Sequence, residues 1–113
     1  MSENLKEITD ESFQNEVIDN DGIVVVDYYA TWCGPCRGIG VVMEEISREY
    51  SDSDTLKIVK GNIEENSDSV SKFGINGVPA ILMFKSGELV SQHVGLRSKK
   101  DLKRDIEEVR NAQ

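Results

Sequence analysis

The chain's only two cysteines, Cys33 and Cys36, stand three residues apart in the stretch WCGPC. A helical pattern begins directly after the first of them, so we expect Cys33 at the N-terminus of a helix. There its sulfur faces unpaired backbone N–H groups and the positive end of the helix dipole, an interaction worth roughly 0.3–1 kcal/mol for a negative charge. The position therefore favours the thiolate of Cys33, which is the form that attacks a disulfide.

The spacing also allows the two sulfurs to bond to each other. Residues i and i+3 of a first helical turn have Cβ atoms about 5–6 Å apart, and a small adjustment brings them within disulfide range. Gly34 relaxes the backbone between the cysteines, and Pro35 supplies a helical φ where its missing N–H costs nothing. We therefore expect a reversible redox disulfide between Cys33 and Cys36.

Three other interpretations of the cysteine pair remain open. A purely structural disulfide would restrict the unfolded chain by only about 2 kcal/mol, because the loop that it closes is so short. A structural zinc site needs four ligands, and the other soft ligand is His93, far along the chain. An inert buried pair would not require Gly-Pro between the cysteines and a tryptophan before them. Redox chemistry is the interpretation that we favour.

Two elements must position this pair. Residues 22–30, GIVVVDYYA, form an apolar run rich in β-branched side chains, which is typical of a central strand buried on both faces. Over residues 34–50, apolar positions recur with helical spacing and predict one buried face of a helix. These positions are Ile39, Val42, Met43, Ile46 and Tyr50. The cysteines thus lie at a strand-to-helix junction, where an open α/β sheet presents reactive groups.

The N-terminal and middle parts of the chain predict further strands and helices. We expect a short strand at residues 5–8, then a helix that begins at Asp10 as its N-cap. Its inward residues are Phe13, Val17 and Ile18. A third strand at residues 55–63 precedes a short helix at 66–74, with Asn66 as its cap and Gly74 at its end.

The C-terminal part predicts a hairpin and a last helix. Two strands within residues 80–94 meet at a tight turn formed by Ser86 and Gly87. Ser98, with Asp101 three residues later, resembles a capping box. The helix that follows turns Leu102, Ile106 and Val109 toward the sheet. The order β-α-β-α-β-α-β-β-α indicates an α/β sandwich with a mostly parallel sheet and an antiparallel edge.

Composition narrows the class of protein. The chain has 113 residues, 38% of them hydrophobic and 30% charged, which fits one globular domain over residues 1–113. Its formal charge is −8, and no basic run is long enough to follow a phosphate backbone, so nucleic acid is not an expected partner. The N-terminus is polar and the apolar runs are short, so we expect no membrane span and a cytoplasmic location.

With these features placed, the chain resembles the thioredoxin family over nearly its whole length. The resemblance rests on five stretches: VDYYATWCGPC, KGNIEEN, FGINGVPA, FKSGELV and HVG. It implies the thioredoxin fold, a three-layer α/β/α sandwich with a central mixed five-stranded sheet and four helices. It also implies that Cys33 attacks a substrate disulfide and that Cys36 resolves the mixed disulfide.

The resemblance assigns a proton relay beside the cysteines. Asp27 matches the family's buried carboxylate, which exchanges a proton with the second cysteine, and Lys60 matches the lysine that tunes it. The physics of the position agrees, because a carboxylate within an apolar strand is poorly solvated and holds its proton more tightly. The alternative is an aspartate that Lys60 simply neutralises.

The resemblance also implies a substrate-binding surface around the exposed sulfur. Pro79 matches the family's cis-proline, and the backbone of the preceding Val78 is expected to pair with an extended substrate segment. The remaining members of the apolar surface are Trp32, Gly34, Pro35, Val94 and Gly95. A flat apolar surface of this kind accepts many targets without reading their sequence.

The chain departs from the family at several positions. Val41 stands where a kinking proline is usual, and Gly38 and Gly40 precede it, so a weaker helix is expected there. Ala80 replaces a threonine after the cis-proline. Gly61 replaces a larger apolar residue, which predicts a small void in the core.

The resemblance implies a protein-disulfide reductase, an electron carrier that a thioredoxin reductase re-reduces and that acts on disulfide-containing proteins. We expect a monomer with no metal and no organic cofactor. The alternatives are a thiol oxidase or disulfide isomerase, and a non-catalytic binding subunit that uses the same apolar surface. Gly-Pro between the cysteines favours the reductase, because a histidine there would stabilise the thiolate further and favour oxidation.

Overall fold

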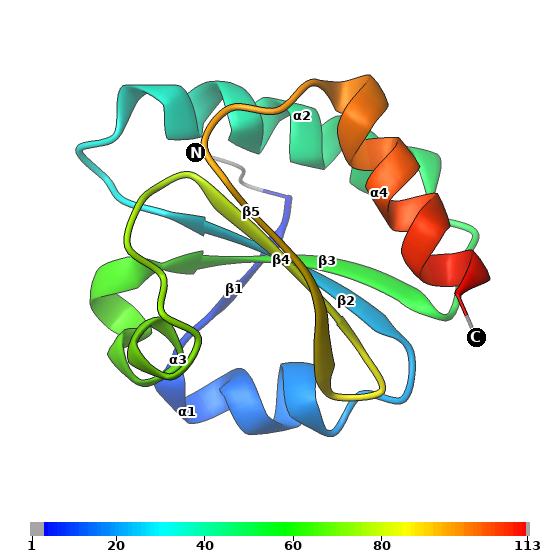
Figure 1. Ribbon diagram of the computed structural model, residues 1–113, viewed down its shortest axis with the longest axis horizontal. Coiled ribbons are helices and arrows are strands. Elements are labelled where there is room, and N and C mark those ends of the chain that lie inside the picture. The colour runs from blue at the N-terminus through cyan, green and yellow to red at the C-terminus, as the bar shows by residue number, and fades with distance from the viewer. Residues whose placement is uncertain (1–3, 113) are drawn as a thin grey trace.

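The structure is a computed structural model that describes residues 4–112, so residues 1–3 and 113 of the expected domain lie outside it. Its elements are β1 (Lys6–Ile8), α1 (Asp10–Phe13), a π-helical segment η1 (Gln14–Ile18), β2 (Ile23–Tyr29), α2 (Gly34–Glu49), β3 (Leu56–Asn62), a 3-10 turn η2 (Ile63–Glu65), α3 (Ser67–Lys72), β4 (Ala80–Lys85), β5 (Glu88–Val94) and α4 (Lys99–Asn111). The strands form one sheet in the order β1-β3-β2-β4-β5. Helices α2 and α4 cover one face of it, and α1 and α3 cover the other (Figure 1). The expected three-layer sandwich with a mixed five-stranded sheet is confirmed.

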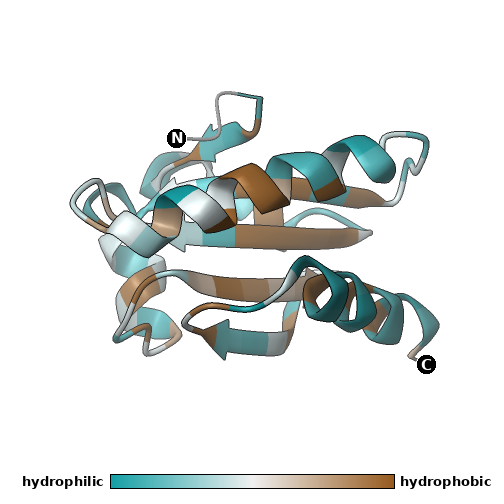
Figure 2. Ribbon diagram, turned by 90° about the horizontal axis from the view of Figure 1, so that it is seen from above, coloured by the Kyte–Doolittle hydropathy of each residue, from teal (hydrophilic) through white to brown (hydrophobic). Residues whose placement is uncertain are grey.

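Two apolar cores lie on the two faces of the sheet, and β2 contributes to both. Val25 packs with α2 and α4, whereas Val24 and Val26 pack on the other face, because successive side chains of a strand point to opposite sides. Colouring by hydropathy shows the central strands as largely hydrophobic and α4 as largely hydrophilic on its outer side (Figure 2). Fully burying one such aliphatic side chain stabilises the fold by about 1.5–3 kcal/mol. The predicted central strand, buried on both faces, is confirmed.

The helix faces follow the predicted spacing. On α2, Ile39, Met43 and Ile46 are buried, and Val42 and Tyr50 pack partly buried beside them. On α4, the buried residues are Leu102, Ile106 and Val109. The side chain of Ser98 accepts a hydrogen bond from the Asp101 N–H (3.1 Å), so the predicted cap of α4 is confirmed.

The direction of β4 corrects one expectation. β1 and β2 both run parallel to β3, but β4 runs antiparallel to β2 and to β5, so parallel and antiparallel pairings are equally numerous. The reason is the length of α3. A six-residue helix spans about 9 Å, whereas a seven-residue strand spans about 23 Å. Because α3 cannot carry the chain back along the sheet, β4 enters from the end at which β3 leaves.

The caps of the two short helices also differ from the prediction. The N-cap of α1 is Thr9, one residue before Asp10, and the Thr9 N–H donates to Ser12 Oγ at 3.0 Å. Asp10 instead caps α3: its carboxylate accepts from the Asp68 N–H (3.1 Å) and from Ser67 Oγ (3.3 Å). Asn66 occupies the N-cap position of α3, but its side chain makes no cap hydrogen bond.

The predicted void at Gly61 is wrong. A methyl group at Gly61 would come within 3.1 Å of Asn66 Nδ2 and 3.3 Å of an Ile8 side-chain carbon. The buried Asn66 amide fills this space and donates to the carbonyls of Ile8 (3.0 Å) and Asn62 (2.8 Å). The small residue on β3 therefore makes room for a side chain that ties β1 to the end of β3.

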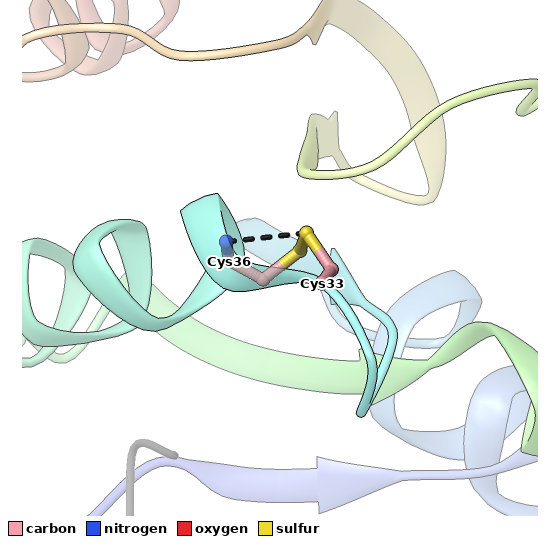
Figure 3. Close-up of a disulfide and its surroundings, with 2 residues drawn as sticks. All are labelled: Cys33 and Cys36. Carbon is pink, nitrogen blue, oxygen red and sulfur yellow. Dashed lines mark hydrogen bonds between the residues drawn. A yellow bond between two sulfur atoms is a disulfide. The ribbon is translucent and has the colours of Figure 1, made fainter.

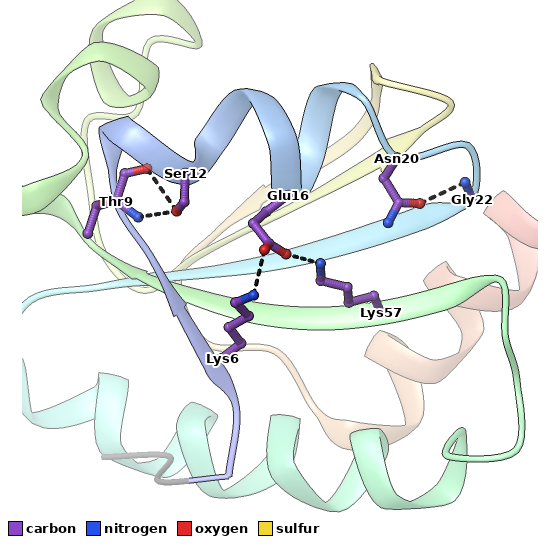
Figure 4. Close-up of polar contacts among 7 residues, drawn as sticks. All are labelled: Lys6, Thr9, Ser12, Glu16, Asn20, Gly22 and Lys57. Carbon is purple, nitrogen blue, oxygen red and sulfur yellow. Dashed lines mark hydrogen bonds and ion pairs between the residues drawn. The ribbon is translucent and has the colours of Figure 1, made fainter.

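A carboxylate fastens the helical layer to the sheet beneath it. Glu16, on η1, accepts hydrogen bonds from Lys6 Nζ on β1 (2.5 Å) and from Lys57 Nζ on β3 (Figure 4). The ammonium groups lower the pKa of Glu16, because they stabilise its charged form.

The hairpin between β4 and β5 closes as predicted. Ser86 and Gly87 have φ values of 50° and 82°, and a two-residue turn of this kind matches the twist of the strands. Among residues 4–112, no helix is both long enough and apolar enough to cross a membrane.

Candidate active site

The two cysteines lie where β2 passes into α2. Cys33 is the N-cap residue of α2, and Pro35 falls in its first turn. A disulfide joins Cys33 to Cys36, with 5.4 Å between their Cα atoms, and the Cys36 N–H donates to Cys33 Sγ at 3.2 Å (Figure 3). This N–H is one of the free donors at the start of the helix, and it would stabilise a negative charge on the same sulfur after reduction.

The two cysteines differ slightly in exposure. Cys33 is 5% exposed and Cys36 is 0% exposed. Both pack with Ala30, and the partly buried Tyr29, Ile63 and Val78 surround them. Of the two cysteines, Cys33 alone retains any exposure to solvent.

The loop before β4 lies against this cluster. The peptide bond between Val78 and Pro79 is cis, as the resemblance implies. Val78 packs on the cysteines and precedes the first paired residue of β4, Ala80. The Pro79 carbonyl accepts from the Gly95 N–H at 2.8 Å, which fixes the end of β5 beside the loop.

An apolar surface surrounds the cysteines. Trp32 is 72% exposed and Val94 is 42% exposed, while Gly34 and Pro35 are exposed between the cysteines. A Cβ atom at Gly77 would lie 3.0 Å from the Val94 side chain, so the loop before β4 and the end of β5 are in contact.

Sequence reasoning missed some members of this surface. A groove of about 260 Å³ is lined by Trp32 and Val78 and also by Ile63 and Ile75. Leu96, the residue after Gly95, is 69% exposed. The position of Leu96 directly after HVG could have indicated that it is exposed. Nothing in the sequence distinguishes Ile63 and Ile75 from ordinary core residues.

Asp27 lies on the face of the sheet that α2 covers. It is 2% exposed, and its Oδ1 has no hydrogen-bond partner among the described residues. Burial raises the pKa of Asp27 to about 7; the positive charge of Lys60 opposes this shift, and the negative charge of Glu7 adds to it. Lys60 is the residue of β3 paired with Asp27, so the structure brings the two predicted residues together.

The described residues contain no group of three or more histidine, cysteine or acidic side chains placed to hold a metal ion. His93, which a zinc site would need, lies on β5 with Nε2 3.5 Å from the Leu96 carbonyl oxygen.

Ala80, which stands where the family usually has a threonine, is fully buried and pairs with Tyr28 on β2 and Val94 on β5.

Comparison with known proteins finds many relatives of this chain. A family model described as thioredoxin matches residues 4–108. The thioredoxin of Pseudomonas aeruginosa is 44% identical over 102 residues, which cover 90% of this chain and 93% of that protein. The thioredoxin of Rickettsia typhi is 43% identical over 95 residues, or 84% of this chain and 89% of that protein. The thioredoxin of Listeria monocytogenes is 43% identical over 98 residues, or 87% of this chain and 91% of that protein.

Proposed function

The chain belongs to the thioredoxin family and is a protein dithiol–disulfide oxidoreductase, and we propose that Cys33 is its attacking nucleophile and Cys36 its resolving thiol. The observation that carries this assignment is the difference in access between the sulfurs. Cys33, at the helix N-terminus, retains 5% exposure, whereas Cys36, one turn further on, has none. A target sulfur approaching from solvent meets Cys33 first.

The reaction then proceeds in two exchange steps. The Cys33 thiolate attacks one sulfur of a target disulfide, which forms a mixed disulfide and releases the other target sulfur as a thiolate. Cys36 gives up its proton, and its thiolate attacks Cys33 Sγ, so the second target sulfur leaves. Two electrons pass from the dithiol to the target, and the Cys33–Cys36 disulfide closes.

Asp27 is the proposed acceptor for the proton of Cys36, and Lys60 tunes it. A carboxyl group that titrates near neutral pH changes its protonation state easily under the conditions of the reaction. Its burial and its unpaired Oδ1 support this role, because a carboxylate engaged in strong hydrogen bonds would be a weak proton acceptor.

The apolar surface is the proposed binding site for targets. It comprises Trp32, Gly34, Pro35, Val78, Pro79, Val94 and Gly95. Val78 lies outside the ladder of β4, which leaves its backbone placed to pair with an extended segment beside Cys33. Val78, Trp32 and Val94 supply apolar contacts on both sides of that segment.

Membership of the family implies a reductase and disulfide-containing proteins as partners in general. We propose more narrowly that a thioredoxin reductase restores the dithiol and that the chain acts as a monomer in the cytoplasm, where thiols are kept reduced. Thiol trapping of the protein in intact cells would give the ratio of dithiol to disulfide. A pair found mostly oxidised would contradict the role of reductant.

Capture of reaction intermediates tests the assignment of the two sulfurs. Cys36→Ser leaves the nucleophile but removes the resolving thiol, so we expect mixed disulfides to accumulate. Cys33→Ser is the matched control and should capture almost no target. Equal capture by the two variants in non-reducing electrophoresis would overturn the assignment.

A further inference from the structure

Three charged residues form a row across three neighbouring strands. Glu7 on β1 is paired in register with Lys60 on β3, and Lys60 is paired with Asp27 on β2. Residues in register on parallel strands point to the same face, and adjacent strands lie about 4.8 Å apart. One ammonium group therefore stands between two carboxyl groups on the face that α2 covers.

Although Glu7 lies on the edge strand β1, three groups contact its carboxylate. Glu7 Oε1 accepts from the Tyr29 hydroxyl at 2.8 Å and lies 3.8 Å from Lys60 Nζ. Glu7 Oε2 accepts from the Asn62 N–H at 3.1 Å. Two hydrogen bonds and an ion pair hold the charge of Glu7 beside Lys60. Tyr29, which donates one of these bonds, packs against the cysteines.

Few other charged groups face Asp27 among the described residues. The buried face of α2 contributes Cys36 and uncharged side chains, and α4 contributes aliphatic ones. Across the sheet, β4 places Ile81 beside Asp27, and β5 places His93 beyond Ile81. Lys60, Glu7, Tyr29, His93 and the two cysteines are thus the ionisable groups on this face near Asp27.

We propose that Glu7 is a positioning residue for the proton-transfer step, because it holds Lys60 toward β1 and so prevents the ammonium from fully neutralising the charge of Asp27. Asp27 then keeps its proton until the pH is close to neutral. The repulsion between the two carboxylates acts in the same direction, since both favour the protonated form of Asp27. The inference rests on the proposed role of Asp27 as the proton acceptor of Cys36.

Titration of the Asp27 carboxyl carbon by NMR, in the oxidised protein, tests the effect of Glu7 directly. Glu7→Gln keeps the shape of the side chain and removes its charge. We expect the pKa of Asp27 to fall by roughly one unit, as a charge two strand spacings away implies at an effective dielectric constant of about 20. From a pKa of about 7, such a fall would raise the ionised fraction of Asp27 at pH 6 roughly fivefold.

Two variants serve as controls. Glu7→Asp retains the charge and should keep most of the wild-type pKa of Asp27. Glu11→Gln removes the same charge from an exposed position on α1, on the opposite face of the sheet, and should leave that pKa unchanged. An unchanged pKa of Asp27 in Glu7→Gln, or an equal fall in Glu11→Gln, would overturn the inference.

The rate of target reduction between pH 5 and 8 separates this inference from the proposed function. If Asp27 accepts the proton of Cys36, the acidic limb of the Glu7→Gln profile should move to lower pH together with the pKa of Asp27. A fall in that pKa with an unmoved limb would support the action of Glu7 on Asp27. It would at the same time show that the assignment of Asp27 as proton acceptor is wrong.

Discussion

The burial of Asp27 lowers the stability of the folded protein and also raises the pKa of its carboxyl group toward neutral pH. Its carboxyl group is buried on a central strand, where the charged form loses the solvation that it has in the unfolded chain. Below its ordinary pKa of 3.8 both states are protonated, and Asp27 adds no pH dependence. Between that value and about 7, the unfolded chain loses the proton while the folded protein keeps it. The free energy of unfolding therefore decreases as the pH rises through this window and stays low above it.

Replacing Asp27 with alanine should remove this penalty. Above pH 7 we expect Asp27→Ala to be more stable than the wild type by up to about 4 kcal/mol, less the packing that the smaller side chain loses. Below pH 4 the advantage should vanish. Denaturant unfolding of the two oxidised proteins from pH 4 to 8 measures this difference. The same variant should reduce a protein disulfide more slowly, and unchanged turnover would exclude the proton-transfer role.

Prediction from the sequence works best at this scale where a residue type conflicts with its neighbours. An aspartate within GIVVVDYYA is such a conflict, and its burial follows from the run alone. Glu7 carries no comparable signal, because a glutamate in a short edge strand reads as an ordinary solvent-exposed residue. Its importance depends on the register between β1 and β3, which the hydrophobic pattern of a three-residue strand is too short to specify.

Helix α2 runs uninterrupted from Gly34 to Glu49, and the two glycines beyond its first residue, Gly38 and Gly40, differ in their surroundings. Gly38 is exposed, and a Cβ atom there would meet nothing within 4 Å, whereas Gly40 is buried. Gly38→Ala should therefore stabilise the oxidised protein by up to roughly 1 kcal/mol, because alanine restricts the unfolded chain. We expect Gly40→Ala to cost stability, since a packing or bending role leaves no room for a methyl group. Urea unfolding with an insulin-reduction assay compares the two, and a more stable, fully active Gly40→Ala would contradict the second half.

The contact between Gly61 and Asn66 gives a prediction about how β1 is attached to β3. Gly61→Ala would press a methyl group against the Asn66 amide and weaken its hydrogen bonds to Ile8 and Asn62. We expect a loss of about 1–3 kcal/mol, typical of overpacking a core. In an Asn66→Ala background the same change should cost less, because the obstructing amide is gone. Thermal unfolding of the four proteins of this double-mutant cycle measures the coupling, and strictly additive effects would argue against it.

Most elements were predictable because they carried their own periodicity and a start or turn signal, as Ser98 before α4 and the Ser86–Gly87 turn between β4 and β5 illustrate. The connections between elements were less so. Asp10 looked like the cap of its own helix, since an aspartate before an amphipathic run usually is one. Its actual partner lies 58 residues away in α3. The direction of β4 depended on comparing the length of α3 with that of β3, which the order of elements does not reveal.

At the scale of the whole molecule, Glu16 joins the helical layer of α1 to two strands of the sheet. Its side chain is 11% exposed and lies between Lys6 and Lys57. Because its pKa is lowered in the folded protein, its contribution to stability is complete above the ordinary value of 4.5 and is lost as the pH falls through the lowered one.

Glu16→Gln should therefore reduce stability at pH 7 by about 1–2 kcal/mol, since charge-assisted hydrogen bonds are replaced by weaker ones. The difference should narrow as the solution is acidified below pH 4. Chemical unfolding at pH 7 and pH 3 tests this, with the exposed Glu11→Gln as the matched control. A similar loss in both variants would indicate a general effect of net charge.

The hydrogen bonds from the start of α3 to Asp10 link α1 and α3, the two helices on one face of the sheet, into one cooperative unit. α3 leads directly into the loop that ends at Val78 and Pro79, so this loop is tied, through one carboxylate, to the first helix of the chain. An opening of α1 removes the acceptor of the Asp68 N–H, and an opening of α3 leaves Asp10 without its donors. Amide hydrogen exchange in α1, in α3 and in the loop should thus share one sub-global opening. The rate at which the substrate-binding loop opens is then set partly by an N-terminal helix, whose Asp10 lies 58 residues before its partner Asp68 in the sequence.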